Sequence, residues 1–598
     1  MPGMDSPWRA WVSATRTRNF CNYDPLLDWL EEYGEAKGFA KDTVAEIYDS
    51  RTDFLQFVLQ KGNEFEAAIL KYLAGQIQLK RIVSEAKEVR DSAAATRTWE
   101  AMGAGIEAIA QAVLWNPETQ TYGAADLLLR SDVLARLFPK SISPGEAALV
   151  APHIPSARWH YRVVDIKFTT LHMLKDGHAA SQHRGYMAQV WLYNEALGRI
   201  QGMVPTCGYL LGRGWEQLKE RGSSAIERLE RVDRDFAFGR KDISLRELAL
   251  GACDWVRRMR TDGGMWAMLP EPSVDELRPN MRYTEDAPWH LAKQQIAAQL
   301  EDLTLLPRVT PQLRQTAIAA GLRRWTDPAC SAERLGISGE TVVPLVNAVI
   351  EANQSPAGGK VVIPDPVTAS EELWRIPKMA EFYVDFETVS DLNDDFSKLP
   401  QKGGQPLIFM IGCGYLTDPS DPQTWAFKVF TAQRLTPNEE RRVISEWLAN
   451  MRTVCAARKT TLEESRLLHW SPAEISTLTT AYNSAAARHG LPSWDRLPWV
   501  DLLNSVVKKQ PVTVRGTFGF GLKAVAKAMH QAGLIATKWG DGPTDGLGAM
   551  VGAWWCDGEA ARHSASMRDL DLMKSIEAYN EVDCRVMAEV LHFLRTQR

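Results

Sequence analysis

Long apolar runs are missing from this sequence and cysteine is scarce, and each shortage excludes a class of protein. No run approaches the roughly twenty apolar residues of a membrane-spanning helix, and the N-terminus has no apolar segment of signal-peptide length. The eight cysteines among 598 residues form no CxxC pair, so neither a zinc ribbon nor an iron–sulfur cluster is expected. We predict a cytoplasmic protein with reduced, packing thiols and no membrane partner.

A phosphate-binding loop for ATP is also missing. The GGK triplet at 358–360 fails the GxxxxGK[ST] spacing, and no other stretch satisfies it. No ATP cofactor is therefore expected, and a helicase or other motor would have to act in trans. The net charge of -5 argues against indiscriminate coating of nucleic acid, yet it allows a basic groove beside acidic metal sites.

One predicted strand carries an acid and a lysine on the same side. Residues 161–170 read YRVVDIKFTT, and alternate residues of a strand face the same way. Asp165 and Lys167 would therefore lie side by side, while Val164 and Ile166 point into a core. A carboxylate can hold a divalent metal, and a neighbouring lysine can position or deprotonate an attacking water.

Further acidic and polar residues accompany this strand. A helix is predicted at 61–73 with Glu66 beside its apolar face, and a hairpin with its turn at 116–119 carries Asp126 into a leucine run. A carboxylate in such a run needs a partner or a metal, because a lone buried charge is costly. A later helix places Gln189 and Tyr193 one turn apart on a shared face.

In order and in element type, this set resembles the RecB-like branch of the PD-(D/E)XK nucleases, over about residues 55–215. The resemblance implies that the acids bind one or two divalent metals, that the lysine serves the attacking water, and that the last two residues contact the nucleic-acid strand. The residues concerned are Glu66, Asp126, Asp165, Lys167, Gln189 and Tyr193.

Two departures from that family are visible. Many relatives carry a histidine just before the helix glutamate, where this chain has Phe65, so the choice between Glu66 and Glu64 stays open. Several relatives also carry a cysteine-bound cluster that is missing here.

The middle of the chain, about 216–354, is predicted to be helical. Within it, 305–325 is similar to a degenerate helix-hairpin-helix element, whose loop lacks the usual glycines. Arg314, Arg323 and Arg324 could contact a nucleic-acid backbone from it. The alternative is a plain helical linker domain. A segment rich in proline and glycine at 354–366 follows and is the main expected boundary.

Two more acids share one face of a predicted strand at 380–391, AEFYVDFETVSD. Asp385 and Glu387 alternate with apolar residues. Neighbouring carboxylates raise each other's proton affinity unless a cation neutralises them, so a metal is the economical explanation. Two further strands, near 406–416 and 424–431, predict an antiparallel opening of this sheet.

The remaining candidates lie further along. A strand is expected to end at His469, a helix to begin near Glu474, and a second strand to hold Asp501. A predicted loop and helix carry Lys523, and a final amphipathic helix places Tyr579 and Asp583 one turn apart.

Residues from about 378 to 598 resemble the DEDD exonucleases with an RNase H-like fold, in their tyrosine-bearing subclass. The resemblance implies two metals held by Asp385, Glu387, a middle acid and Asp583, with Tyr579 orienting the water and Lys523 contacting nucleic acid. Glu474 is the first candidate for the middle acid and Asp501 the second. The alternative is a degenerate domain kept for binding.

The whole order is similar to a family of bacterial and viral RecB-like nucleases with a C-terminal RNase H-like domain. We expect an α/β multidomain protein with a restriction-endonuclease-like core, a helical middle and a mixed-sheet domain. The expected divisions are a cap or docking segment at 1–52, a nuclease domain at 53–215, a helical linker domain at 216–354, a Pro/Gly linker at 355–377 and an exonuclease domain at 378–598.

The resulting hypothesis is a nuclease dependent on Mg²⁺ or Mn²⁺ with two active sites on single-stranded or end-containing DNA. The first site would cut and the second would trim, from the 3′ end. Two alternatives stay open: a nucleic-acid-binding scaffold of a repair, replication or defence complex with silent sites, and an exonuclease acting on RNA.

Overall fold

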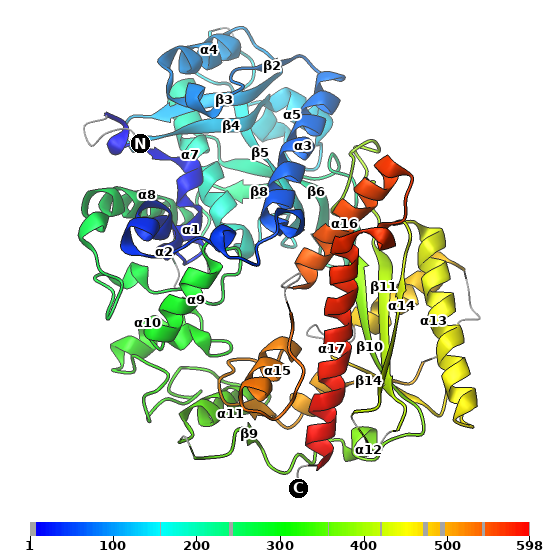
Figure 1. The fold of residues 1–598 in the computed structure, drawn as a ribbon. Helices are drawn as coiled ribbons and strands as arrows, with labels where there is room; N and C mark the ends of the chain where they lie inside the picture. The colour runs from blue at the N-terminus through cyan, green and yellow to red at the C-terminus, as the bar shows by residue number, and fades with distance from the viewer. Residues whose placement is uncertain are drawn as a thin grey trace. The chain divides into compact units, whose positions relative to one another are not determined.

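The computed structural model describes residues 7–155, 157–238, 243–356, 358–418, 421, 423–470, 477–490, 497–540 and 545–596. It is an α/β protein with mixed sheets and helices, which confirms the expected class (Figure 1). The chain forms two compact units. Unit 1 comprises 1–43, 57–296 and 394–404, and unit 2 comprises 44–56, 297–393 and 405–598.

Unit 1 is built on an eight-stranded mixed sheet in the order β2-β3-β4-β5-β6-β7, with β1 added to β4 and β8 added to β6. Its strands are β1 (Val12–Ser13), β2 (Leu79–Arg81), β3 (Ala108–Asn116), β4 (Thr121–Arg130), β5 (Tyr161–Met173), β6 (Cys207–Gln217), β7 (Glu220–Gly222) and β8 (Glu230–Asp233). The predicted hairpin is β3 and β4, and the predicted acid-and-lysine strand is the core of β5, so both predictions are confirmed.

Helices lie on both faces of that sheet. The helices from the N-terminal half of the chain are α1 (Arg18–Cys21), α2 (Leu26–Trp29), α3 (Phe54–Ala74), α4 (Ser92–Gly103), α5 (Ser131–Leu137), α6 (Pro144–Ala147), α7 (Arg184–Gln201), α8 (Leu245–Asp262) and α9 (His290–Gln299), the last of which crosses the boundary of unit 1 at residue 296. On β6, the side chain of Tyr209 packs in a hydrophobic core together with residues of α3. A Cβ on the preceding residue, Gly208, would instead collide with Val190 of α7. Because neighbouring strand residues face opposite ways, α3 and α7 lie on opposite faces.

Unit 2 contains a five-stranded sheet in the order β12-β11-β10-β13-β14. Its strands are β10 (Glu381–Val389), β11 (Leu407–Leu416), β12 (Trp425–Thr431), β13 (Arg466–His469) and β14 (Trp499–Asp501). The first three strands are antiparallel, which confirms the predicted opening, and β13 and β14 continue the sheet in parallel.

The other elements of unit 2 are mostly helices, with a short two-stranded sheet of β9 (Val362–Ile363) and β15 (Thr513–Val514). The helices are α10 (Pro311–Ala319), α11 (Val342–Gln354), α12 (Glu371–Trp374), α13 (Pro437–Ala457), α14 (Thr477–Arg488), α15 (Leu522–Gln531), α16 (Gly546–His563) and α17 (Asp571–Thr596). Figure 1 shows the sheet between α13 and α17. A side chain at Gly412 of β11 would collide with Asn580, so this glycine lets α17 approach the strand closely.

The units do not follow the expected divisions. The region expected as a helical linker domain, 216–354, begins inside β6, adds β7 and β8 to the sheet of unit 1, and is divided between the units at residue 296. The expected linker at 355–377 lies within unit 2, where β9 pairs with β15 and Trp374 is fully buried. Local proline and glycine content does not reveal such strand pairing, and this is why composition misplaced the boundary.

The stretch expected as a helix-hairpin-helix is not one. Between 305 and 325 the structure places a single α-helix, α10, preceded by a 3-10 turn at Leu303–Leu305. The turn is fixed by Asp302, whose carboxylate accepts a hydrogen bond from the Thr304 amide at 2.8 Å. No second helix follows Ala320 in this described stretch, so the element that would present backbone amides to a phosphate is missing.

The expectations about thiols and apolar runs agree with the structure. All eight cysteines are free and buried, as packing thiols are. Among the described residues, no helix combines the length and the apolar character needed to cross a membrane.

Candidate functional sites

The first candidate site lies in unit 1 at the middle of β5. The carboxylate of Asp165 is fully buried, and Lys167 Nζ lies 2.7 Å from its Oδ2. Val164 and Ile166 point to the opposite face and join the core under α3. The predicted alternation is therefore confirmed, and it places a buried acid and an ammonium side by side.

Asp126 reaches the same place from β4. Its Oδ2 accepts a hydrogen bond from the Ile166 amide at 2.8 Å and lies 3.9 Å from Lys167 Nζ. This bond fixes the carboxylate against β5, where the antiparallel β4–β5 pairing has brought it. One lysine thus contacts two aspartates from two strands.

Glu66 joins this group through a residue that sequence reasoning missed. Gln111 of β3 donates from Nε2 to Glu66 Oε1 at 2.6 Å and to Asp126 Oδ1 at 3.3 Å. Its φ of 50° lies in the left-handed region, which is unfavourable for a residue other than glycine and is found at functional sites. Glu64 instead accepts from Gln60 and Lys61 on the helix surface, which favours Glu66 of the two alternatives.

Gln189 and Tyr193 lie at the site but are buried. Gln189 Nε2 is 3.4 Å from Asp165 Oδ1 and 3.3 Å from the Tyr193 hydroxyl. The Tyr193 ring fills the space above Gly123, where a Cβ would lie 2.6 Å from it. In this arrangement Gln189 orients Asp165 and Tyr193 holds Gln189. Both side chains are buried and offer no surface to a nucleic-acid strand, contrary to the expectation.

Burial dominates the electrostatics of the first site. It raises the pKa of Asp165 to about 8, although the nearby Lys167 ammonium opposes that shift. The two aspartates in turn outweigh burial at Lys167 and raise its pKa above the ordinary value. Burial and the neighbouring Asp126 also raise the pKa of Glu66. A site with three acids and one lysine has surplus negative charge that a divalent cation would neutralise.

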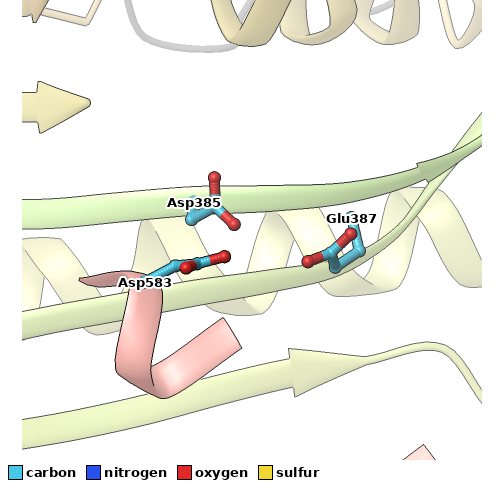
Figure 2. A group of neighbouring side chains, drawn as sticks. All are labelled: Asp385, Glu387 and Asp583. Atoms are coloured by element: carbon cyan, nitrogen blue, oxygen red, sulfur yellow. The ribbon is translucent and has the colours of Figure 1, made fainter. Parts of the chain in front are cut away.

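The second candidate site lies in unit 2, where β10 and α17 meet. Asp385 and Glu387 project from the same side of β10, and Asp583 faces them from α17 (Figure 2). One oxygen from each carboxylate lies within 4.8 Å of the others. Among the described residues, no other three acidic, histidine or cysteine side chains come together as tightly.

Two residues that sequence reasoning missed hold these carboxylates. Asn580 donates from Nδ2 to Asp385 Oδ2 at 3.0 Å and lies 3.5 Å from Glu387 Oε1. Trp539 donates from Nε1 to Asp583 Oδ1 at 2.8 Å. Neither belongs to a recognisable motif: Asn580 sits inside the final helix, and Trp539 lies in a loop more than forty residues before Asp583.

The carboxylates of the second site favour their protonated forms when no cation is bound. Burial and then the charge of Asp583 raise the pKa of Asp385 well above its usual range, and burial and Asp385 do the same for Glu387. Burial raises the pKa of Asp583 to about 6, while Lys523 and the Trp539 hydrogen bond oppose the shift. Like charges held this close need either protons or a cation.

Tyr579 and Lys523 lie beside the three acids. Lys523 Nζ is 4.4 Å from the centre of the Tyr579 ring, close enough for a cation–π contact. Burial lowers the pKa of Lys523, and burial together with Asp583 raises the pKa of Tyr579. The hydroxyl therefore stays protonated and can donate a hydrogen bond.

Of the two candidates for the middle acid, the structure describes only Asp501. Glu474 lies outside the described residues. Asp501 on β14 lies opposite His469 on β13. Its carboxylate accepts hydrogen bonds from the Leu503 and Asn504 backbone amides at 3.0 and 3.2 Å, and from the Asn504 side chain at 2.7 Å. Asp501 thus caps the chain that follows it and does not join the acidic cluster.

The three arginines expected to contact nucleic acid do not behave alike. Arg314 is buried and pairs with Asp302 at 3.1 Å, so it stabilises the turn before α10 and is not available to a phosphate. This corrects the expectation for Arg314. Arg323 and Arg324 are exposed, and Arg324 lies 3.7 Å from Glu301.

Both sites offer oxygen ligands of the kind that Mg²⁺ and Mn²⁺ prefer, and at both sites the neighbouring acids are costly to ionise unless a cation is bound. The donor sets therefore fit a divalent cation, most closely at the second site. In comparisons with known proteins, no protein-family model, no curated protein and no solved structure matches this chain.

Proposed function

We propose that this chain is a metal-dependent nuclease with two active sites that hydrolyse phosphodiester bonds in single-stranded DNA. The observation that carries the proposal is the cluster of Asp385, Glu387 and Asp583, whose carboxylate oxygens lie within 4.8 Å of one another. Glu387 and Asp583 are buried and Asp385 is partly buried. Buried like charges at this spacing are costly unless they serve a cation. The strand order of unit 2 and the placement of the acids support an RNase H-like exonuclease, and those of unit 1 support a RecB-like PD-(D/E)XK nuclease.

At the second site, Asp385, Glu387 and Asp583 would hold Mg²⁺ or Mn²⁺. A bound divalent cation lowers the pKa of a water and stabilises the leaving oxygen. The protonated hydroxyl of Tyr579 would orient the attacking water, and Lys523 beside it would offset phosphate charge. These roles suit removal of nucleotides from a 3′ end.

At the first site, Glu66, Asp126 and Asp165 would be the cation ligands. Lys167, whose Nζ lies 2.7 Å from Asp165 and 3.9 Å from Asp126, would stand beside a cation held by these acids. Its ammonium can then hold the attacking water or offset charge on the phosphate. Gln189, behind Asp165, would keep the carboxylate in position rather than contact the strand.

The test is cleavage of end-labelled single-stranded and duplex DNA and RNA with Mg²⁺ or Mn²⁺. Wild type, Asp165→Asn, Asp385→Asn and the double variant are compared, with Lys87→Gln, an exposed side chain outside both sites, as the control. We expect Asp165→Asn to lower the rate of cutting by the first site, and Asp385→Asn to lower the rate of trimming by the second, each by about 100-fold or more. The double variant should lose both activities. Labelled RNA in the same assay identifies the polymer.

Loss of all cleavage in one single variant that remains folded would refute two independent sites. Binding without turnover on every substrate would favour the scaffold alternative, since a scaffold needs no metal-dependent chemistry.

A further inference from the structure

A polar cavity of about 270 Å³ lies in unit 1 beside the first site. This volume is slightly below the roughly 300–1,000 Å³ of pockets for drug-sized ligands, so it suits a small polar group. The wall comes from α1, from the end of β5, from the first turn of α7 and from a later segment. Its lining residues include Arg18, Thr169, Gly185, Tyr186, Tyr283 and Glu285.

Hydrogen-bond donors dominate this wall. Arg18 brings a guanidinium, and two amides, two phenols and a threonine add further donors. The two lining histidines, His172 and His183, are already paired with Glu216 and Glu230. Among the lining residues, Glu285 is the one acid. Its carboxylate accepts from Arg18 and lies 3.4 Å from the Tyr283 hydroxyl. An arginine held by a largely exposed glutamate can exchange that partner for another anion.

The positive end of a long helix adds to this character. Helix α7 spans 18 residues, and its first turn carries Gly185 and Tyr186 at the cavity. The N-cap residue His183 makes no side-chain hydrogen bond to the first turn of α7, and the positive end of a helix dipole attracts anions. A Cβ on Gly185 would lie 3.0 Å from Arg18 Cγ, so the glycine makes room for the arginine.

The cavity shares a border with the first site. Thr169 follows Lys167 by two residues on β5. The Tyr186 ring lies 5.3 Å from Lys167 Nζ, so one aromatic side chain contacts the proposed catalytic lysine and lines the cavity. A group bound in the cavity would therefore lie next to the bond that the first site cuts.

We propose that this cavity binds a phosphate group of the nucleic-acid strand adjacent to the scissile bond, with Arg18 as its main charged contact. The proposal rests on the proposed nuclease function of the first site. It adds a substrate-binding position built partly by α1 and by residues 283–285, which lie outside the 55–215 region that carries the proposed catalytic residues.

The test measures binding of a fluorescent oligothymidylate to the full chain in Ca²⁺, with and without a 5′-phosphate. Inorganic phosphate serves as competitor. We expect Arg18→Gln to weaken binding about 5- to 20-fold and Glu285→Gln, which removes the carboxylate, to strengthen it about 3-fold. Arg16→Gln, two residues away and outside the lining, is the matched control and should change little. Misfolding cannot produce the strengthening.

A difference confined to 5′-phosphorylated strands would assign the cavity to a terminal phosphate, and equal effects on both strands would assign it to an internal one. If Arg18→Gln and Glu285→Gln changed the binding affinity in the same direction, or left it unchanged, the proposal would be overturned. Binding shifts of opposite sign without any nuclease turnover would instead refute the proposed function and leave the anion site intact.

Discussion

At the scale of single residues, the second site depends on an amide that belongs to no motif. Asn580 donates to Asp385 and approaches Glu387, and its own Oδ1 is buried without a hydrogen-bond partner among the described residues. Turning the amide over would place that oxygen against the carboxylates, so the donor orientation is fixed. Partners of metal-binding carboxylates position them and tune their affinity.

We therefore expect Asn580→Ala to raise the Mn²⁺ concentration for half-maximal trimming by about 10- to 100-fold. Cutting by the first site, measured in the same sample, should not change and serves as the internal control. An unchanged metal requirement at the second site would show that Asn580 only fills space beside Gly412.

The acids and the lysine that carry the proposed chemistry were predictable from sequence because each follows a local rule. Asp165 and Lys167, like Asp385 and Glu387, alternate along a strand, and Asp583 lies one helical turn from Tyr579. Gln111 and Trp539 follow no such rule. They reach the sites only through tertiary packing, and one sequence contains no signal for that.

At the scale of elements, short helix α2 is held in unit 1 by a buried acid. Asp28 accepts hydrogen bonds from Asn19 at 2.8 Å and from Trp255 of α8 at 3.1 Å. Burial raises the pKa of Asp28 from 3.8 to about 6, although both hydrogen bonds oppose the shift. Between these two values the folded protein keeps a proton that the unfolded chain has released, so the free energy of unfolding falls as pH rises through this window.

The Asp28→Asn variant should lose this dependence. Relative to wild type, its free energy of unfolding should increase by about 2–3 kcal/mol between pH 4 and pH 8, because two pKa units correspond to about 2.7 kcal/mol. Thermal unfolding of both proteins across this range is the measurement. Asp254→Asn, at an exposed acid on α8, is the control, and its free energy of unfolding should change with pH as that of wild type does. If the free energy of unfolding of Asp28→Asn differed from wild type by the same amount at every pH, Asp28 would not be the source of the pH dependence.

At the scale of the whole molecule, each unit contains a segment that the chain order would assign to the other. Residues 394–404, which follow β10, belong to unit 1, and residues 44–56, which lead into α3, belong to unit 2. Sequence patterns located the strands and helices on either side, yet they gave no sign of this exchange. Contacts between segments hundreds of residues apart determine which unit each of these segments joins, and a local sequence pattern carries no information about such contacts.

The 394–404 segment supports the elements that carry the first site. Phe396 packs 5.5 Å from the ring of Phe65 and 5.9 Å from that of Phe168. These two residues are the immediate neighbours of Glu66 and Lys167. The segment is also held by backbone bonds, from Lys402 N to Ser223 O at 3.1 Å and from Ala225 N to Pro400 O at 2.8 Å.

A fragment of residues 1–299 should therefore be less stable than unit 1 in the intact chain, since it lacks this segment. Adding a peptide of residues 394–404 in excess should raise the melting temperature of the fragment, because a ligand that binds only the folded state stabilises it by mass action. The same peptide with Phe396→Ala should fail to raise the melting temperature, since removing a packed phenylalanine ring costs a few kcal/mol.

In the full chain, Phe396→Ala should lower cutting by the first site and leave trimming by the second site unchanged. Equal loss at both sites would mean that the segment supports general stability and not the first site in particular.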